Sequence, residues 1–261
     1  MRDASYDPLT VAALGVVAMC LVTAAHEVVG HGVACLVAGG HILVLTSSIF
    51  RCDVGSLWVA PAGPAGNLLA ALAAMLTARA VPPRHVTLRL LLVLIACLGC
   101  YWEAGYAIHA MLRRDGDLYF AGRDLIGEPS AWWRLAGGAA GIGLYLVSTR
   151  WLTGMLSSAW PRSATARGVA RTAWLSATLG AVVAAGACAT DRGADLRDAF
   201  LEIGLASVPL LLVPRGRRAA ATTDAAAILP RSWVTVGAAL IVYALFVATL
   251  GRGLFFRVAH D

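Results

Sequence analysis

The sequence predicts an all-α integral membrane protein with six or seven transmembrane helices. Of its 261 residues, 59% are hydrophobic and 14% are charged, and the mean hydropathy is +0.73. A soluble domain of this size needs more polar residues to cover its surface. The apolar residues are also gathered into runs of roughly 20 residues, the length that crosses the hydrocarbon core of a bilayer. We therefore expect the chain to be embedded in a lipid bilayer, in the cell (inner) membrane.

The first apolar run extends from about Val11 to Ala38. It is longer than the apolar part of a cleaved signal peptide, so we expect it to remain as the first helix. Further spans are predicted at Leu57–Thr77, Val86–Leu112, Trp132–Leu156, Val169–Thr190, Ala199–Val213 and Trp233–Leu250. The run Ala199–Val213 gives the weakest signal, because it is short and contains Glu202 and Pro209.

The formal charge of +6 comes from arginines, since the chain contains no lysine. These arginines are spread over short loops, which argues against binding to nucleic acid and for anchoring at lipid headgroups. If the spans alternate strictly, slightly more arginines fall on the N-terminal side of the membrane and most acids fall on the other. The tendency of positive loops to stay inside then predicts a cytoplasmic N-terminus.

The cysteines do not indicate a secreted disulfide framework. Five of the six lie in apolar runs and are expected to pack there: Cys20, Cys35, Cys97, Cys100 and Cys188. Cys97 and Cys100 form one C-x-x-C pair without a second pair, and packing explains it better than redox chemistry or metal binding.

A short β-hairpin is predicted between the first two spans, over Gly39–Phe50. Two glycines end the first helix there, and β-branched and apolar residues follow. Backbone of this kind is tolerated at membrane depth only where protein or a wet cavity satisfies its polar groups. The segment would then line a site, and its strand edge could pair with an extended substrate. An ordinary interfacial loop is the alternative.

Ionisable residues interrupt the first apolar run, in His26-Glu27-Val28-Val29-Gly30-His31. Such groups are costly in hydrocarbon and usually mark function. Two imidazoles beside a glutamate also form the combination that zinc enzymes use, with histidines as ligands and the glutamate as general base. The alternative is a purely structural cluster of buried polar groups.

The two histidines are five residues apart, and this spacing needs an explanation. On a regular helix five residues turn by about 500°, so the two side chains would diverge by roughly 140°. A one-residue π-bulge would absorb the extra residue, and Gly30 would ease the distortion. Without a bulge, Glu27 and His31 could both bind a metal, and His26 would act as the base or support the ligands. We prefer the bulge because it leaves Glu27 free to activate water.

Two further motifs supply polar groups. Gly63-Pro64-Ala65-Gly66-Asn67 combines residues that allow close helix approach with an amide that needs a hydrogen-bond partner. Asp115 and Asp117 follow the third run, and either could be the third protein ligand that catalytic zinc usually has. Glu103 lies deeper in that run, where a polar contact to a ligand is a better explanation than direct ligation.

Taken in order, these residues resemble the motifs of site-2-protease-type intramembrane zinc metalloproteases. The resemblance rests on His26-Glu27 with His31, then on Gly63-Pro64-x-x-Asn67, then on Gly116-Asp117, and it covers roughly Val11 to Asp124. The usual family motif is H-E-x-x-H, so the five-residue spacing is a departure. It leaves open an inactive relative with the same fold.

The resemblance implies a three-helix catalytic core. It implies His26, His31 and Asp117 as Zn²⁺ ligands, Glu27 as general base and Asn67 as an amide that positions the substrate or its oxyanion. On this reading residues 1–130 are a metalloprotease-like catalytic membrane core, and residues 131–261 are additional transmembrane helices of unknown role. The expected activity is hydrolysis of a peptide bond in a membrane-embedded protein or peptide substrate.

Two other classes of function fit the same residues. Buried histidines and acids also form pathways for metal ions or protons in transporters. The chain could instead be a catalytically inactive membrane scaffold. Metal content and turnover distinguish the three.

Overall fold

The structure is a computed structural model, which describes residues 6–160, 163–188, 192–212 and 228–256. One long N-terminal helix is divided into α1, a π-helical segment η1 and α2, and a three-stranded sheet is the only sheet among these residues. In chain order the elements are α1 Pro8–Ala24, η1 Ala25–Gly32, α2 Val33–Val37, β1 Ile42–Leu45, β2 Phe50–Cys52, α3 Val59–Ala80, α4 Val86–Arg113, α5 Asp117–Ile126, α6 Ala131–Ala159, α7 Ser163–Ala185, α8 Arg192–Ala199, η2 Phe200–Leu205, η3 Val208–Leu212, α9 Trp233–Phe246, η4 Val247–Gly251 and β3 Leu254–Phe255.

Five helices are long and apolar enough to cross a membrane, where the sequence predicts six or seven. They are Pro8–Val37, Val59–Ala80, Val86–Arg113, Thr165–Ala185 and Trp233–Gly251. The predicted span Trp132–Leu156 forms the long helix α6, but Arg134 and Arg150 interrupt its apolar sequence. In the predicted span Ala199–Val213, the described residues comprise the end of α8 and the short segments η2 and η3.

The helix α1 begins at a well-formed cap. Asp7 Oδ1 accepts hydrogen bonds from Thr10 N (2.9 Å) and Thr10 Oγ1 (3.0 Å), and Pro8 opens the helix. Arg231 Nε donates to Asp7 Oδ2 at 3.1 Å and so connects this cap to the segment before α9. Burial tends to raise the pKa of Asp7, but the hydrogen bonds from Thr10 and Arg231 outweigh it and lower the pKa.

The predicted hairpin is confirmed. Strands β1 and β2 pair in antiparallel register, with Leu45 opposite Phe50 and Ile42 opposite Cys52. The sequence analysis did not predict β3, which joins the other edge of β1 and places Phe255 opposite Val44. The strand order is therefore β2-β1-β3, and the outer edge of β2 has no strand partner among the described residues.

A disulfide corrects the expectation that Cys35 only packs. Cys35, in α2, is bonded to Cys52, in β2. The bond therefore joins the end of the long N-terminal helix to the hairpin. The sequence around Cys52 does not identify it as the disulfide partner of Cys35. The two cysteines meet only because the chain turns back between them. The four other cysteines are buried and form no disulfide, as expected.

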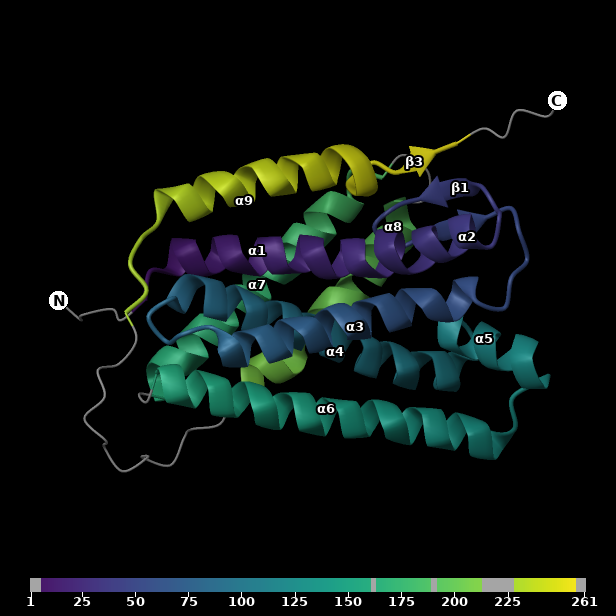
Figure 1. The fold of residues 1–261 in the computed structure, drawn as a ribbon, viewed down its shortest axis with the longest axis horizontal. Coiled ribbons are helices and arrows are strands. Elements are labelled where there is room, and N and C mark those ends of the chain that lie inside the picture. Colours follow the sequence, from purple (N-terminus) through teal and green to yellow (C-terminus); the bar gives the residue numbers. More distant parts are fainter. Residues whose placement is uncertain (1–5, 161–162, 189–191, 213–227, 257–261) are drawn as a thin grey trace.

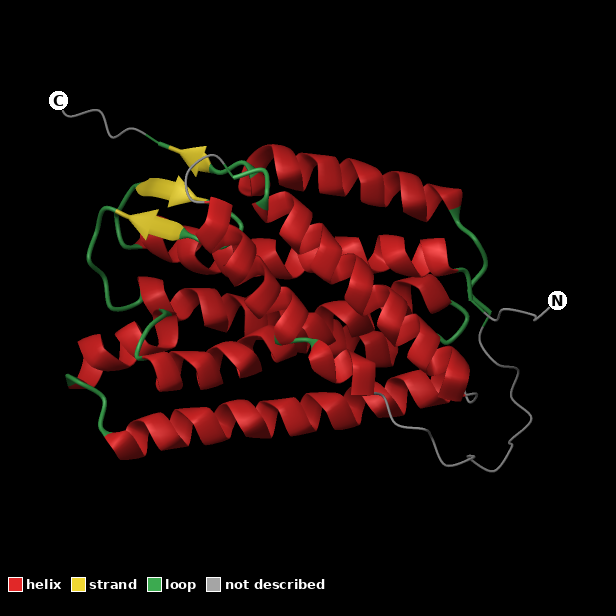
Figure 2. Cartoon of the chain, turned by 180° about the vertical axis from the view of Figure 1, so that it is seen from behind, coloured by secondary structure: helices red, strands yellow, loops and turns green. Residues whose placement is uncertain are grey.

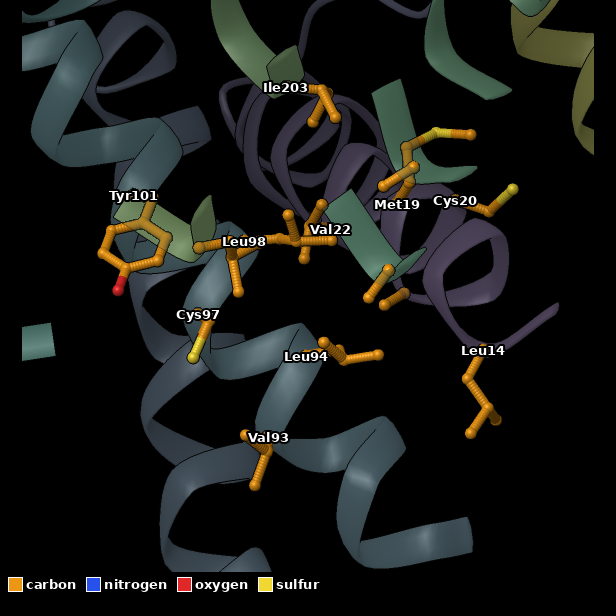
Figure 3. Packing of buried hydrophobic residues seen from close by; sticks show 14 of the residues in the cluster. Leu14, Met19, Cys20, Val22, Val93, Leu94, Cys97, Leu98, Tyr101 and Ile203 are labelled. Atoms are coloured by element: carbon orange, nitrogen blue, oxygen red, sulfur yellow. The ribbon is translucent and has the colours of Figure 1, made fainter. Parts of the chain in front are cut away.

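The predicted catalytic part and the remainder of the chain share one hydrophobic core. Helix α1 packs against α4 on one side and against α7 and α9 on others. Figure 3 shows this core at close range, where Met19 and Val22 of α1 lie near Leu98 of α4 and Ile203 of η2. The residues after 131 therefore complete the packing of the first helix.

The sheet lies at one end of the helical bundle. In Figure 1 the strands β1 and β3 share this end with α2, α5 and α8, and α1 begins at the opposite end. The view from behind in Figure 2 places the strands at the same end. The arginines that favour a cytoplasmic N-terminus include several outside the described residues: Arg2, Arg162, Arg215, Arg217 and Arg218.

Candidate metal centre

The helix carries a π-helical segment at the histidine motif. Residues Ala25–Gly32 form η1, with α-helix on both sides, which confirms the predicted π-bulge. Its wider turn absorbs the extra residue between His26 and His31, whose ring centroids lie 4.9 Å apart. Both imidazoles are buried. The geometry in which they diverge on a regular helix is excluded.

Glycines allow η1 and α3 to cross at very short distance. A Cβ atom added at Gly30 would lie 2.5 Å from Ala62 O and 2.6 Å from Gly63 Cα. A Cβ atom added at Gly63 would overlap the Nε2 atom of His31 and crowd that of His26. The Gly-Pro motif thus serves close helix approach, as its composition suggested, and it leaves room where the two imidazoles meet.

Asp117 is brought to the histidines by a tight turn after α4. Gly116 has φ of +87°, a conformation that favours glycine, and a Cβ atom there would lie 2.6 Å from Tyr106 Oη. Tyr106 Oη donates to Asp117 Oδ2 at 3.1 Å and accepts from Asp117 N at 3.0 Å. The start of α5 is therefore fixed on α4.

His26, His31 and Asp117 together form a group that could hold a metal ion. One ligand atom from each lies within 4.8 Å of the others. Asp117 Oδ2 is 3.5 Å from His26 Nε2 and 3.2 Å from His31 Nε2. Burial tends to raise the pKa of Asp117, but hydrogen bonds from both histidines outweigh it and hold the pKa well below its ordinary value. The carboxylate is therefore ionised, as a metal ligand must be.

The ring of His31 is oriented so that its Nε2 atom faces the position where the three possible metal ligands meet. Its Nδ1 atom lies 2.7 Å from Val59 O. A carbonyl oxygen only accepts, so Nδ1 carries a proton, and Nε2, which faces Asp117, is the nitrogen that can give up its own proton to bind a metal ion. The ring of Phe50, from β2, stacks on His31 at a centroid distance of 5.2 Å.

His26 is oriented in the same way by a carboxylate. Its Nδ1 atom lies 3.0 Å from Glu103 Oε1, and Trp102 stacks on its ring at 4.7 Å. Asn67 Nδ2 donates to the same oxygen of Glu103 at 2.8 Å. A carboxylate behind a ligating histidine is common in metal sites, where it fixes the ring and increases its basicity.

Asn67 does not occupy the place that the resemblance implies. Its side chain is fully buried, and it is not among the residues that line the cavity beside the histidines. The amide therefore contacts Glu103 and cannot touch a substrate in that cavity. Its helical position predicted a polar contact, but its direction depends on how α3 packs against α4.

Glu27 lies beside the histidines without a partner of its own. Its side chain is only 3% exposed, and its Oε2 atom has no hydrogen-bond partner among the described residues. An unpartnered buried carboxylate oxygen is costly. Glu27 also lines the cavity, so its carboxyl group lies next to the space that a water or a substrate would occupy.

A cavity of about 1330 Å³ opens beside the group. The histidines, Glu27 and Asp117 form one part of its wall, and β2 contributes Phe50 and Arg51. The second half of the chain also lines the cavity, through Tyr145 and the segment around Glu202. Sequence reasoning did not assign these two residues or Tyr106 to the site, because no local pattern marks them.

Asp115 lies at the same cavity but outside the metal-binding group. Its side chain is exposed and its Oδ1 atom accepts a hydrogen bond from Gly116 N. Of the two candidate aspartates, only Asp117 meets the histidines.

Comparisons of the chain with protein-family models, with curated proteins and with solved structures find no match.

Proposed function

We propose that this protein is an intramembrane zinc-dependent endopeptidase. The observation that carries the proposal is the convergence of His26, His31 and Asp117 beside Glu27, a buried carboxylate without a partner, at a cavity among membrane-spanning helices. Three protein ligands and a free glutamate form the donor set of a catalytic zinc site.

The residues fit zinc by their chemistry. Nitrogen ligands from two histidines and oxygen from one carboxylate are donors that zinc accepts, and both imidazoles have their Nδ1 atoms engaged elsewhere. In the described part of the chain three protein groups meet, which leaves a coordination position for water or substrate. When bound, zinc polarises a substrate carbonyl and lowers the pKa of its water toward about 7.

Glu27 acts as the general base on this proposal. It accepts the proton of the attacking water and later delivers it to the leaving amine nitrogen. Its burial between the histidines holds it close to the reacting atoms. Glu103 acts through His26, because it accepts a hydrogen bond from His26 Nδ1 and so keeps the proton on that nitrogen. Asn67 positions Glu103 by donating to the same carboxylate oxygen.

A peptide substrate would reach these residues in extended form. The carbonyls of an intact helix are engaged in its own hydrogen bonds, so a transmembrane substrate has to unwind locally. Strand β2 lines the cavity and its outer edge has no strand partner in the described part of the chain. An unwound segment could add to that edge through main-chain hydrogen bonds.

The test is metal content combined with turnover. Purified protein is expected to carry close to one zinc ion, and the double variant His26→Ala/His31→Ala is expected to lose it. Glu27→Gln should keep the zinc and lose proteolysis of a membrane-embedded substrate. Zinc that persists in the double variant would place the ion elsewhere.

The same experiment separates the other functions. Loss of zinc in Glu27→Gln would support Glu27 and His31 as the ligand pair. Movement of zinc or protons across liposomes, without cleavage, would identify a transporter. A protein without metal, in which Glu27→Gln changes only stability, would be a scaffold.

A further inference from the structure

We infer that Glu202 recognises a positively charged side chain of the substrate, an arginine or a lysine, in the cavity beside the metal-binding group. The inference rests on the proposed peptidase function and adds a substrate class to it. It assigns a role to a residue from the second half of the chain, outside the resemblance that the sequence shows.

Glu202 shares the cavity with the proposed catalytic residues. It lies in η2, the π-helical segment Phe200–Leu205, and its partly buried side chain lines the cavity together with His26, Glu27 and Asp117. Its carboxylate is close enough to His26, Glu27 and Asp117 to interact with them electrostatically. A substrate held at the histidines would therefore pass near Glu202.

The backbone around Glu202 is held by three helices. Tyr145 Oη, from α6, donates to Ala206 O at 2.9 Å, and Trp174 Nε1, from α7, donates to Gly204 O at 2.9 Å. On α4, Gly105 permits close contact, since a Cβ atom there would lie 2.9 Å from Ala206 Cβ. The position of Glu202 is thus fixed by packing, as a residue that selects substrates requires.

Of the five other carboxylates at this cavity, four have a side-chain partner or a role, and Asp115, which is exposed, accepts only from the backbone amide of Gly116. Asp117 meets two histidines and Tyr106. Asp198 accepts from Arg197 at 2.8 Å, and Asp124 accepts from Arg123 at 3.2 Å. Glu27 is the proposed base. Glu202 makes no hydrogen bond or ion pair with any described residue, so the mechanism leaves it unused.

The charge of the cavity favours a cation there. Among its described lining residues, six carboxylates face two guanidinium groups, although the whole chain is positive. Asp124 is paired with Arg123 outside the lining, so an excess of three carboxyl groups remains, which one divalent metal ion would not fully offset. An acid at membrane depth is costly without a counter-charge. A basic side chain of the substrate would supply this counter-charge to Glu202.

The experiment compares two peptides of the same shape. The first is a fluorescently labelled apolar peptide with one arginine, and the second carries citrulline, which is neutral, in its place. Binding is measured by fluorescence anisotropy to zinc-loaded protein carrying Glu27→Gln, so that no cleavage is needed. We expect the arginine peptide to bind about tenfold more tightly, the effect of one partly buried ion pair.

Further variants in the same background assign this preference to a residue. Adding Glu202→Gln should abolish the difference between the peptides, and adding Glu202→Asp should keep part of it. Asp124→Asn is the matched control, because it removes a paired carboxylate from the same cavity and should leave the preference unchanged. Zinc content and melting temperature report whether each variant is folded.

Equal binding of the two peptides by the parent protein would overturn the inference, even if the Glu202 variants failed to fold. A preference that survives Glu202→Gln would overturn it too. Neither result bears on whether the protein is a peptidase, since cleavage by the wild-type protein is a separate measurement.

Discussion

Asp117 meets both histidines, whereas the two other acids near it do not. Asp115 accepts a hydrogen bond only from the next backbone amide and is exposed. Glu103 lies behind His26, on its Nδ1 side, and so faces away from the position where the three possible metal ligands meet. The three acids are close in space but their side chains point in different directions. The sequence gives the number of residues between them, and it does not give these directions.

We therefore expect Asp117→Ala to weaken zinc binding strongly, by at least tenfold, because it removes one of three ligands. Asp115→Ala is the control and should change zinc affinity little. Competition with a chelator of known affinity measures both. If Asp115→Ala released the metal and Asp117→Ala did not, the third ligand would have been assigned to the wrong aspartate.

Some residue roles could be predicted from the sequence and others could not. His26, Glu27, His31 and Asp117 stand out because ionisable residues are rare in apolar runs. Asn67 also stands out, but the sequence does not show that it faces Glu103 and not the cavity. The direction of such a side chain depends on how α3 and α4 are oriented relative to each other, and a local sequence pattern does not determine that orientation.

The π-helical segment η1 is the element on which the site depends. Its presence could be inferred from the five-residue spacing, because a regular helix would separate the histidines. The segment η2 carries no such signal, since a single acid in an apolar run is compatible with many local geometries. Strand β3 is also missing from the predictions, because it is two residues long and its partner is distant in the sequence.

Gly30→Ala is expected to disrupt this element. The added methyl would lie about 2.5 Å from Ala62 O, so η1 and α3 must move apart, and the histidines would separate from Asp117. We expect a lower melting temperature, by overpacking of about 1–3 kcal/mol, and loss of zinc. Gly32→Ala is the control within the same segment, because its methyl would make a closest contact of 3.4 Å. Equal behaviour of the two variants would refute the close crossing.

The cap of α1 gives a pH-dependent prediction. Asp7→Ala removes the acceptor for Thr10 N and should cost about 1 kcal/mol of stability. Because folding lowers the pKa of Asp7, the stabilisation by its charge is present above its unfolded pKa of roughly 3.9 and is lost as pH falls through the folded value. Melting temperatures of wild type and variant should therefore differ at pH 7 and converge at lower pH. A difference that persists unchanged in acid would exclude the charge as its cause.

At the scale of the whole molecule, the disulfide gives a prediction about orientation. Bonds of this kind persist in oxidising compartments and are rare in the cytosol. Cys35–Cys52 lies at the end of the bundle that carries the sheet and the cavity. We expect that end to face away from the cytoplasm, which agrees with the predicted cytoplasmic N-terminus.

Thiol counting checks this expectation. Protein denatured without reductant should show four reactive thiols, and six after reduction. In intact cells treated with a mild reductant, a thiol reagent that cannot cross the membrane should label Cys35 and Cys52. The double variant Cys35→Ser/Cys52→Ser serves as the blank. Six free thiols before reduction would contradict the bond, and absence of labelling at Cys35 and Cys52 in intact cells would contradict the orientation.

The pairing of β1 with β3 has a consequence for biosynthesis. A ribosome makes the helices with His26, His31 and Asp117 early, but Val44 finds its partner only when Phe255 has been added. A two-stranded hairpin is marginal by itself, so until then the hairpin that lines the cavity is held by its own pairing and by the Cys35–Cys52 disulfide. We therefore expect the sheet beside the cavity to reach its final form only after Phe255 has been added.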